Sequence, residues 1–363
     1  MTTPKVPARD FEPPEPPKFR ILAIDGGGIR GLIPAIVLAE LERQLQRSDP
    51  AATLSKHFDL ISGTSTGGLI ALGLTTPGAD GEPALDPAGM IELYSGPEAQ
   101  EIFERPPLER LPGIGHISDL LDPRYSLDGL QRALERRLGD RAVSEALTGV
   151  LVPAYGMHDR SPRFFKPWNE EGRTTRAVDA GLATSAAPTY FPAKRLGDEA
   201  LVDGGVFVNN PTIAATIEAL KRTEGEPLHA EDLLVVSLGT GQHERGFDPD
   251  EVTGWGALGW IAPSKGSEPP LIGAMLDGQS DASHHWAHIL LNHEAGTAVA
   301  RGVELGAGPR YYRWQIELPA PLPLDGVADE ELERLRECGE ALAAARSAEI
   351  AAVAAALVAG VQS

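Results

Sequence analysis

The sequence predicts an α/β protein, a three-layer α/β/α sandwich whose mainly parallel central sheet lies between two layers of helices. Two observations predict this fold class. Apolar runs of strand length, such as residues 19–24 and 233–238, end at acidic residues or glycines, as buried strands do. Segments with apolar residues at helical spacing separate these runs, and such alternation favours a parallel sheet covered on both faces.

The individual elements follow from local patterns. After the first strand, residues 34–47 have helical spacing, and Pro34 is tolerated in a first turn. Further strands are predicted at residues 58–62, 150–154, 163–166 and 311–318, and one that ends near Val202. Further helices are predicted at residues 67–74, 87–104, 126–139, 177–187 and 211–221, and as one long helix over 328–359.

Three parts of the chain are distinguished by composition. Residues 1–18 contain six prolines and are predicted to form a disordered leader. Residues 19–320 form one catalytic domain, and its segment 241–281, rich in Gly, Pro and Asp, is expected to be a cap-like excursion. Residues 321–363 are expected to supply a C-terminal helix packed on the same domain.

Charge and cysteine content exclude several classes of function. The formal net charge is −20, with 52 acids against 32 bases, which disfavours a nucleic-acid polymer as a partner. The single cysteine allows no internal disulfide and fits a reducing compartment. No apolar run of 18 residues and no signal-like segment occurs, so we expect a cytoplasmic protein.

The stretch DGGGIRG, residues 25–31, places bare backbone between a predicted strand and a predicted helix. Its glycines 26, 28 and 31 match the dinucleotide fingerprint, which would indicate a nucleotide-binding oxidoreductase. That function requires an acid at the end of a second strand, and the candidate, Asp49, follows a helix instead. A plain turn is the other alternative. Successive glycine amides before a helix also stabilise anions, including the oxyanion of acyl transfer.

A candidate nucleophile for acyl transfer follows in the next turn. Residues 63–67, GTSTG, match the G-x-S-x-G elbow and lie between a predicted strand and a predicted helix. The glycines at both ends allow the sharp turn that exposes the hydroxyl of Ser65. A small-residue turn that happens to contain serine is the alternative.

The base that would activate Ser65 has two candidate sources. The histidines of residues 280–293 lie on a predicted amphipathic helix, at a spacing that also permits metal ligation; they are His284, His285, His288 and His293. No acid completes a metal site with them, and a solvated or interface face explains the pattern. Asp203 instead ends a strand, and Gly204 and Gly205 follow it, so its carboxylate is expected to face the same crevice as Ser65. Taken alone, this Asp-Gly-Gly is typical of a turn.

The three motifs together, in this order, resemble those of patatin-like phospholipases over residues 19–240. The resemblance implies an α/β/α fold, hydrolysis of phospholipid acyl esters, no cofactor and no metal. It implies a Ser65–Asp203 dyad without histidine, oxyanion amides from Gly27 and Gly28, and Arg30 facing the lipid phosphate. Asp25 is then structural. The remaining motif glycines are Gly26, Gly31, Gly63, Gly67, Gly204 and Gly205.

Residues 235–318, from VVSLGTG to YYRWQIEL, resemble a bacterial subset of that family. The resemblance implies an activating cyclic dinucleotide, a role in antiphage defence and action at the inner membrane surface, and it leaves room for a homo-oligomer. A constitutive esterase or lipase is the alternative function. A catalytically silent scaffold is a third hypothesis, which the intact Ser65 and Asp203 disfavour.

Overall fold

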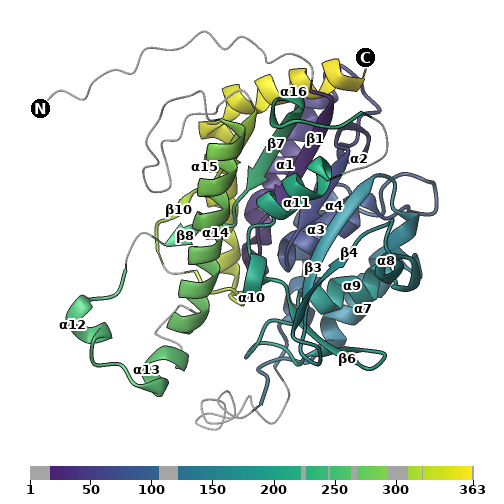
Figure 1. The fold of residues 1–363 in the computed structure, drawn as a ribbon. Helices are drawn as coiled ribbons and strands as arrows, with labels where there is room; N and C mark the ends of the chain where they lie inside the picture. Colours follow the sequence, from purple (N-terminus) through teal and green to yellow (C-terminus); the bar gives the residue numbers. More distant parts are fainter. Residues whose placement is uncertain are drawn as a thin grey trace, which may run out of the picture.

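The computed structural model describes residues 17–105, 122–221, 226–243, 246–262, 268–292, 310–320 and 322–361. The predicted leader, residues 1–18, lies outside this part of the chain except for Pro17 and Lys18. In the described residues a twisted sheet lies between two layers of helices, which confirms the predicted three-layer sandwich (Figure 1).

The main sheet is mixed. Its parallel part has the order β3-β2-β1-β7-β9, and β4, β5 and β6 add antiparallel pairs beside β3. The strands of the parallel part are β1 (Phe19–Ile24), β2 (Leu60–Gly63), β3 (Gly149–Gly156), β7 (Leu233–Leu238) and β9 (Tyr311–Trp314). The antiparallel strands are β4 (Ser161–Phe165), β5 (Lys194–Leu196) and β6 (Glu199–Asp203).

The two faces of β1 are buried against different helices. Leu22 and Ile24 belong to the larger core, whereas Phe19 and Ile21 belong to the smaller one, as strand alternation requires. The larger core includes residues of α1 (Leu32–Leu45), α3 (Thr66–Thr75), α4 (Pro87–Ser95), α5 (Pro97–Ile102), α7 (Asp128–Leu138) and α9 (Ala177–Thr184). The smaller core lies under α11 (Thr212–Leu220) and α14 (Pro270–Leu291). Both faces of the parallel strands are covered, so their sequences are apolar without strict alternation.

One strand extends beyond its neighbour and thereby positions a candidate site residue. The pairing of β2 with β3 ends at Ser62 and Leu151, but β3 continues to Gly156. The extra residues of β3 pair with the antiparallel strand β6, with Ala154 opposite Asp203. The end of β6 therefore lies beside the carboxyl end of β2.

Residues 241–281 contain two short helices, α12 (Pro249–Val252) and α13 (Ala257–Ile261), and the first half of α14. Residues 244–245 and 263–267 of this segment lie outside the described residues. The helix expected over residues 280–293 is confirmed as the second half of α14. The described part of α14 packs against α10 (Gly205–Val208), α11 and β9.

The strand predicted over residues 311–318 is divided in two. β9 ends at Trp314 because its partner β7 ends at Leu238, and Gly241 then takes a φ of 91°. The chain resumes pairing as β10 (Glu317–Leu318) with β8 (Gln242–His243). Between the two pairs the Gln315 side chain accepts a hydrogen bond from the amide of Gly241, at 2.8 Å. Similarly, the helix predicted over 87–104 is two helices, α4 and α5, with Gly96 between them.

The single C-terminal helix predicted over 328–359 is wrong. The chain forms α15 (Asp329–Ala345) and α16 (Ser347–Val361), which meet at Arg346 with a bend of 69°. Both helices pack against α1, and the bend lets Ile350 and Leu357 be buried as well as Leu335 and Leu342. Among the described residues no single helix is long and apolar enough to cross a membrane; by length and composition only this bent pair passes that test together.

Candidate active site

Ser65 lies in a strained turn between β2 and α3. Its φ of 52° and ψ of −120° are unusual for a residue with a side chain, and such strain is often found at functional sites. A Cβ on Gly63 would lie 1.9 Å from the carbonyl oxygen of Gly67, and one on Gly67 would lie 2.2 Å from that of Ile24. Glycine is therefore required on both sides of the serine, as the G-x-S-x-G pattern predicts.

A hydrogen bond holds the backbone of this turn. The Ser65 amide donates to Oγ1 of Thr184 at 3.0 Å, and Thr184 ends helix α9. The same turn lies against the glycine loop, since a Cβ on Gly26 would be 3.3 Å from Cβ of Ser65. The serine side chain is thus positioned from two directions.

Asp203 ends β6 and lies next to Ser65. Its carboxylate accepts a hydrogen bond from the Gly205 amide, at 2.7 Å from Oδ1. The residue is only 5% exposed, and burial raises the pKa of the Asp203 carboxyl to about 7, even though the Ser65 side chain and the Gly205 amide both lower it. A carboxylate with a pKa near 7 is matched to proton transfer at neutral pH.

The glycine loop between β1 and α1 is fixed on both sides. A Cβ on Gly27 would lie 2.3 Å from Oγ1 of Thr240, and one on Gly28 would lie 2.1 Å from the carbonyl oxygen of Leu324. The amide of Ile29 donates to that Leu324 oxygen at 2.8 Å. No hydrogen bond within the described part of the chain uses the amides of Gly27 and Gly28, and both residues line the same cavity as Ser65.

Two of the remaining motif glycines also lie so close to neighbouring atoms that a Cβ would clash with them. A Cβ on Gly31 would meet Oγ1 of Thr66 at 2.2 Å, and one on Gly204 would meet the carbonyl oxygen of Pro153 at 2.5 Å. The amide of Gly205 donates a hydrogen bond to the Asp203 carboxylate.

The cavity at Ser65 has an empty volume of about 920 Å³ and a mainly apolar lining. Its polar lining includes Ser65, Asp203 and Ser185, and Ser185 Oγ is buried with no hydrogen-bond partner among the described residues. The apolar lining includes Leu69, Ile102, Phe191, Met275 and Leu276. A half-buried serine with an apolar cavity beside it suits an ester that carries a long hydrocarbon chain.

Arg30 has a different environment from the one expected. It lines a neighbouring pocket of about 390 Å³, and its Nη2 donates to Oε2 of Glu268 at 2.9 Å in a buried ion pair. Its Nε is buried without a hydrogen-bond partner among the described residues. The contact of Arg30 with a lipid phosphate stays a prediction.

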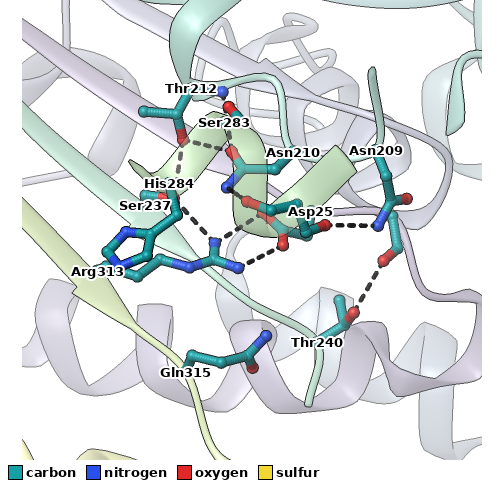
Figure 2. Close-up of polar contacts among 12 residues, drawn as sticks. Asp25, Asn209, Asn210, Thr212, Ser237, Thr240, Ser283, His284, Arg313 and Gln315 are labelled. Atoms are coloured by element: carbon teal, nitrogen blue, oxygen red, sulfur yellow. Dashed lines mark hydrogen bonds and ion pairs between the residues drawn. The ribbon is translucent and has the colours of Figure 1, made fainter. Parts of the chain in front are cut away.

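Asp25 directly precedes the glycine loop and forms a buried ion pair with Arg313. Its carboxylate forms two hydrogen bonds with Arg313, at 2.8 and 2.6 Å, and Arg313 also donates to Oγ of Ser237 (Figure 2). Thr212 Oγ1 links Ser237 to Asn210, so the network joins β1, β7, β9 and the start of α11. The structural role that the sequence suggested for Asp25 fits this geometry.

The histidines do not line the cavity at Ser65. His284 and His288 are buried on α14, where Nδ1 of His284 lies 2.9 Å from Oη of Tyr311. Burial lowers the pKa of His284 to about 3. His293 lies outside the described residues, and among those described no group of three or more His, Cys, Asp or Glu side chains is placed to hold a metal ion.

Sequence patterns missed several residues that shape the site. Thr184 and Ser185 at the end of α9 lie within the family-like stretch 183–193, but no role was predicted for them. Glu268 lies before α14, and no local motif marks it. Arg313 follows Asp25 by 288 residues, so only the fold brings the two together. No role was predicted for Asn209, yet its carbonyl oxygen accepts a hydrogen bond from the Gly26 amide at 3.0 Å.

Comparison with known proteins now assigns the chain to a family. The model of the patatin-like phospholipase family matches residues 22–216. The chain is 35% identical over 308 residues to patatin-like protein 2 of Arabidopsis thaliana, covering 77% of this chain and 74% of that protein. It is 36% identical over 299 residues to patatin-like protein 1 of Oryza sativa subsp. indica, covering 74% and 70%.

Among solved structures, VipD from Legionella pneumophila aligns with a TM-score of 0.41 and 12% identity, over 90% of this chain and 67% of that one. The sequence matches span both glycine-rich turns and the strand that ends at Asp203. The chain therefore belongs to the patatin-like phospholipase family of serine ester hydrolases.

Proposed function

We propose that the protein hydrolyses fatty-acyl esters of membrane phospholipids through a Ser65–Asp203 dyad. The observation that carries this proposal is that Ser65 and the buried Asp203 carboxylate line one cavity with Gly27 and Gly28, whose amides have no hydrogen-bond partner among the described residues. A nucleophile, a base with a pKa near neutrality and oxyanion donors are the three parts that acyl transfer requires.

In the first step Ser65 Oγ attacks the carbonyl carbon of the ester while Asp203 accepts the hydroxyl proton. The carbonyl oxygen becomes an oxyanion, and the amides of Gly27 and Gly28 donate to it. The tetrahedral intermediate then collapses. The bond to the leaving alcohol breaks, Asp203 returns the proton to that alcohol, and the acyl group stays on Ser65.

In the second step Asp203 takes a proton from water, and the resulting hydroxide attacks the acyl carbon. The bond to Ser65 Oγ breaks, Asp203 returns the proton to that oxygen, and the fatty acid leaves. These steps use only groups of this chain, so we expect activity to persist in EDTA.

The proposal is tested by comparing wild type with Ser65→Ala on a defined phospholipid and on a short uncharged ester. We expect the variant to lose turnover and fluorophosphonate labelling while its thermal melt is retained. Ser144→Ala is the matched control, because Ser144 is an exposed serine away from the cavity. Residual turnover by Ser65→Ala within tenfold of wild type would refute the assignment of the nucleophile.

We propose separately that a cyclic dinucleotide activates the enzyme at the inner membrane surface in antiphage defence. Its support is the resemblance of residues 235–318 to a bacterial subset of the family, together with the net charge of −20, which disfavours spontaneous docking on anionic lipid. An activator that shifts a population from 1:99 to 99:1 must bind the active state more tightly by about 5.5 kcal/mol.

The purified protein should then be nearly inert on liposomes and gain activity with one ligand of a cyclic-dinucleotide panel. Full activity without ligand, unchanged by the whole panel, would instead identify a constitutive lipase.

A further inference from the structure

The segment between β8 and α14 exposes an unusual amount of apolar surface. Neither α12 nor α13 contains a buried residue, although the segment is rich in large apolar side chains. The exposed fractions are 46% for Phe247, 66% for Leu258, 37% for Trp260, 42% for Ile261 and 41% for Leu271. We call these five residues the apolar patch. They lie on one short segment and on the first turn of α14, against which α13 packs, and exposed apolar side chains gathered in this way mark an interaction site.

The patch has an ordered aromatic base. The ring of Trp255 lies 4.9 Å from that of Phe247 and 5.4 Å from that of Trp260, and both pairs are edge-to-face. A Cβ on Gly259 would lie 2.7 Å from Cγ of Trp255, so the turn between these rings is closely packed. The rings hold one another in place, while the aliphatic side chains remain exposed.

The patch is continuous with the catalytic cavity. Helix α13 packs against α14, and Leu271 is followed directly by Ile272, which lines the cavity together with Met275 and Leu276. Figure 1 shows α12 and α13 projecting from the body of the protein beside the end of α14 that lies near α10. One face of the first turns of α14 therefore meets the cavity, and Leu271 belongs to the exposed surface.

The charge of residues 241–281 indicates which kind of lipid surface the apolar patch can bind. Residues 241–281 contain seven acids and two bases, and the described residues 246–262 contain no Lys or Arg. A lipid surface that attracts proteins through anionic head groups requires clustered cations, which this region lacks. Tryptophan and aliphatic side chains instead favour the boundary between head groups and acyl chains.

We propose that the apolar patch docks the enzyme onto a lipid bilayer of zwitterionic head groups and delivers the substrate from that surface to Ser65. This inference rests on the proposed phospholipid substrate. Docking through the patch places the cavity lining of α14 against the bilayer, so an acyl chain passes from one apolar environment to another without crossing water. A second copy of the chain is the other partner that such a surface could take, and the test includes it.

The experiment measures partition onto phosphatidylcholine vesicles by co-sedimentation, in a Ser65→Ala background so that no lipid is consumed. The double variant Leu258→Ser/Ile261→Ser removes the two most exposed aliphatic side chains of α13. We expect its partition to fall about tenfold or more, as the loss of two buried apolar side chains implies.

The matched control is Ile217→Ser/Ile289→Ser, which removes two equally exposed aliphatic residues from α11 and α14, outside the patch. Its partition should stay within about twofold of the parent, since lost binding scales with the apolar area that enters the interface. When Ser65 is intact, the variant Leu258→Ser/Ile261→Ser should hydrolyse a short soluble ester at the wild-type rate, because neither side chain lines the cavity.

Four results would overturn the proposal: equal partition of patch and control variants, stronger binding on addition of phosphatidylserine, loss of binding in high salt, or a dimer that only the patch variant dissociates. Failure of the proposed function looks different. An enzyme that binds vesicles through the patch but cleaves no phospholipid would keep this inference and refute the substrate assignment.

Discussion

The turn after β1 and the turn after β2 are neighbours in the fold and glycine-rich in sequence, yet they present opposite chemistry. The first turn presents two backbone amides, from Gly27 and Gly28. The second presents one side chain, Ser65, in a strained conformation. The first is held by Thr240, Leu324 and the ion pair beneath it, and the second by its own backbone and Thr184. Similar composition therefore yields the proposed oxyanion-binding amides in one turn and the proposed nucleophile in the other.

The largest effect is expected from replacing Asp203, the proposed base for Ser65 in the second turn. Asp203→Asn keeps the size of the side chain and its hydrogen bond to Gly205 but cannot accept the serine proton. We expect ester turnover to fall about 10³-fold or more, as deeply as in Ser65→Ala, because general base and nucleophile act as one unit. His285→Ala is the control and should retain most activity. Equal losses in both variants would point to a triad.

The first turn is tested at Gly28. Gly28→Ala adds a Cβ 2.1 Å from the carbonyl oxygen of Leu324 and should displace the amide that faces the oxyanion. We expect turnover to fall about 10²–10³-fold, corresponding to ~3 kcal/mol of barrier, on phospholipid and short ester alike.

A matched control separates the clash from the backbone conformation. Gly81 has a φ of +84°, compared with +58° at Gly28, but nothing lies within 4 Å of a Cβ placed there. Gly81→Ala should therefore lower the melting temperature slightly and leave turnover unchanged. If Gly28→Ala behaves in the same way, the first turn does not supply oxyanion donors.

Substitutions of Arg30 test whether its side chain binds the substrate phosphate or holds the first turn in its conformation. Arg30→Ala should lower phospholipid turnover about tenfold more than turnover of an uncharged ester if the guanidinium meets a phosphate, and Arg30→Lys should be milder. The variant leaves Glu268 buried without this partner, so its thermal melt should also fall, and Arg30→Met/Glu268→Leu should recover part of that loss. Equal losses on both substrates would mean that Arg30 positions the glycine loop.

The smallest effect expected is a pH dependence of stability. The pKa of Asp203 is about 7 in the folded chain and near 3.8 when exposed, so the folded state binds the proton more tightly. The stability that this proton provides is lost as pH rises from about 4 through about 7. Activity should rise over the upper part of that range, because the base must be ionised. Asp203→Asn should show a flatter melting temperature against pH, and a slope equal to wild type would contradict the assignment.

The sequence allowed the parts of the site with local signatures to be predicted. Strands β1 and β7 have the predicted bounds, and GTSTG forms the expected turn. Asp203 was expected at the crevice because strand ends of a parallel sheet meet at one edge. It does lie there, but β6 is antiparallel, and the extra length of β3 places it. Strand length relative to a neighbour is a property of the sheet, which no local pattern records.

Long-range partners account for the rest. No proline or glycine marks the bend at Arg346 in the sequence. The bend follows from the packing of both helices on α1. The pairing of Arg30 with Glu268 joins residues 238 positions apart, and no sequence pattern links the two. Charges buried together in this way are visible only once the fold is known.

The ion pair between Asp25 and Arg313 has a consequence for the newly made chain. The glycine loop leaves the ribosome well before the arginine that pairs with Asp25, because that arginine follows 288 residues later. Proteins are synthesised from the N-terminus, so the elbow and the loop wait for β9 before they hold their final shape. We expect esterase activity on refolding to appear together with the burial of Trp314 on β9, and activity that precedes this burial would contradict the idea. An acyl hydrolase would thus stay inactive until β9 has been synthesised and paired.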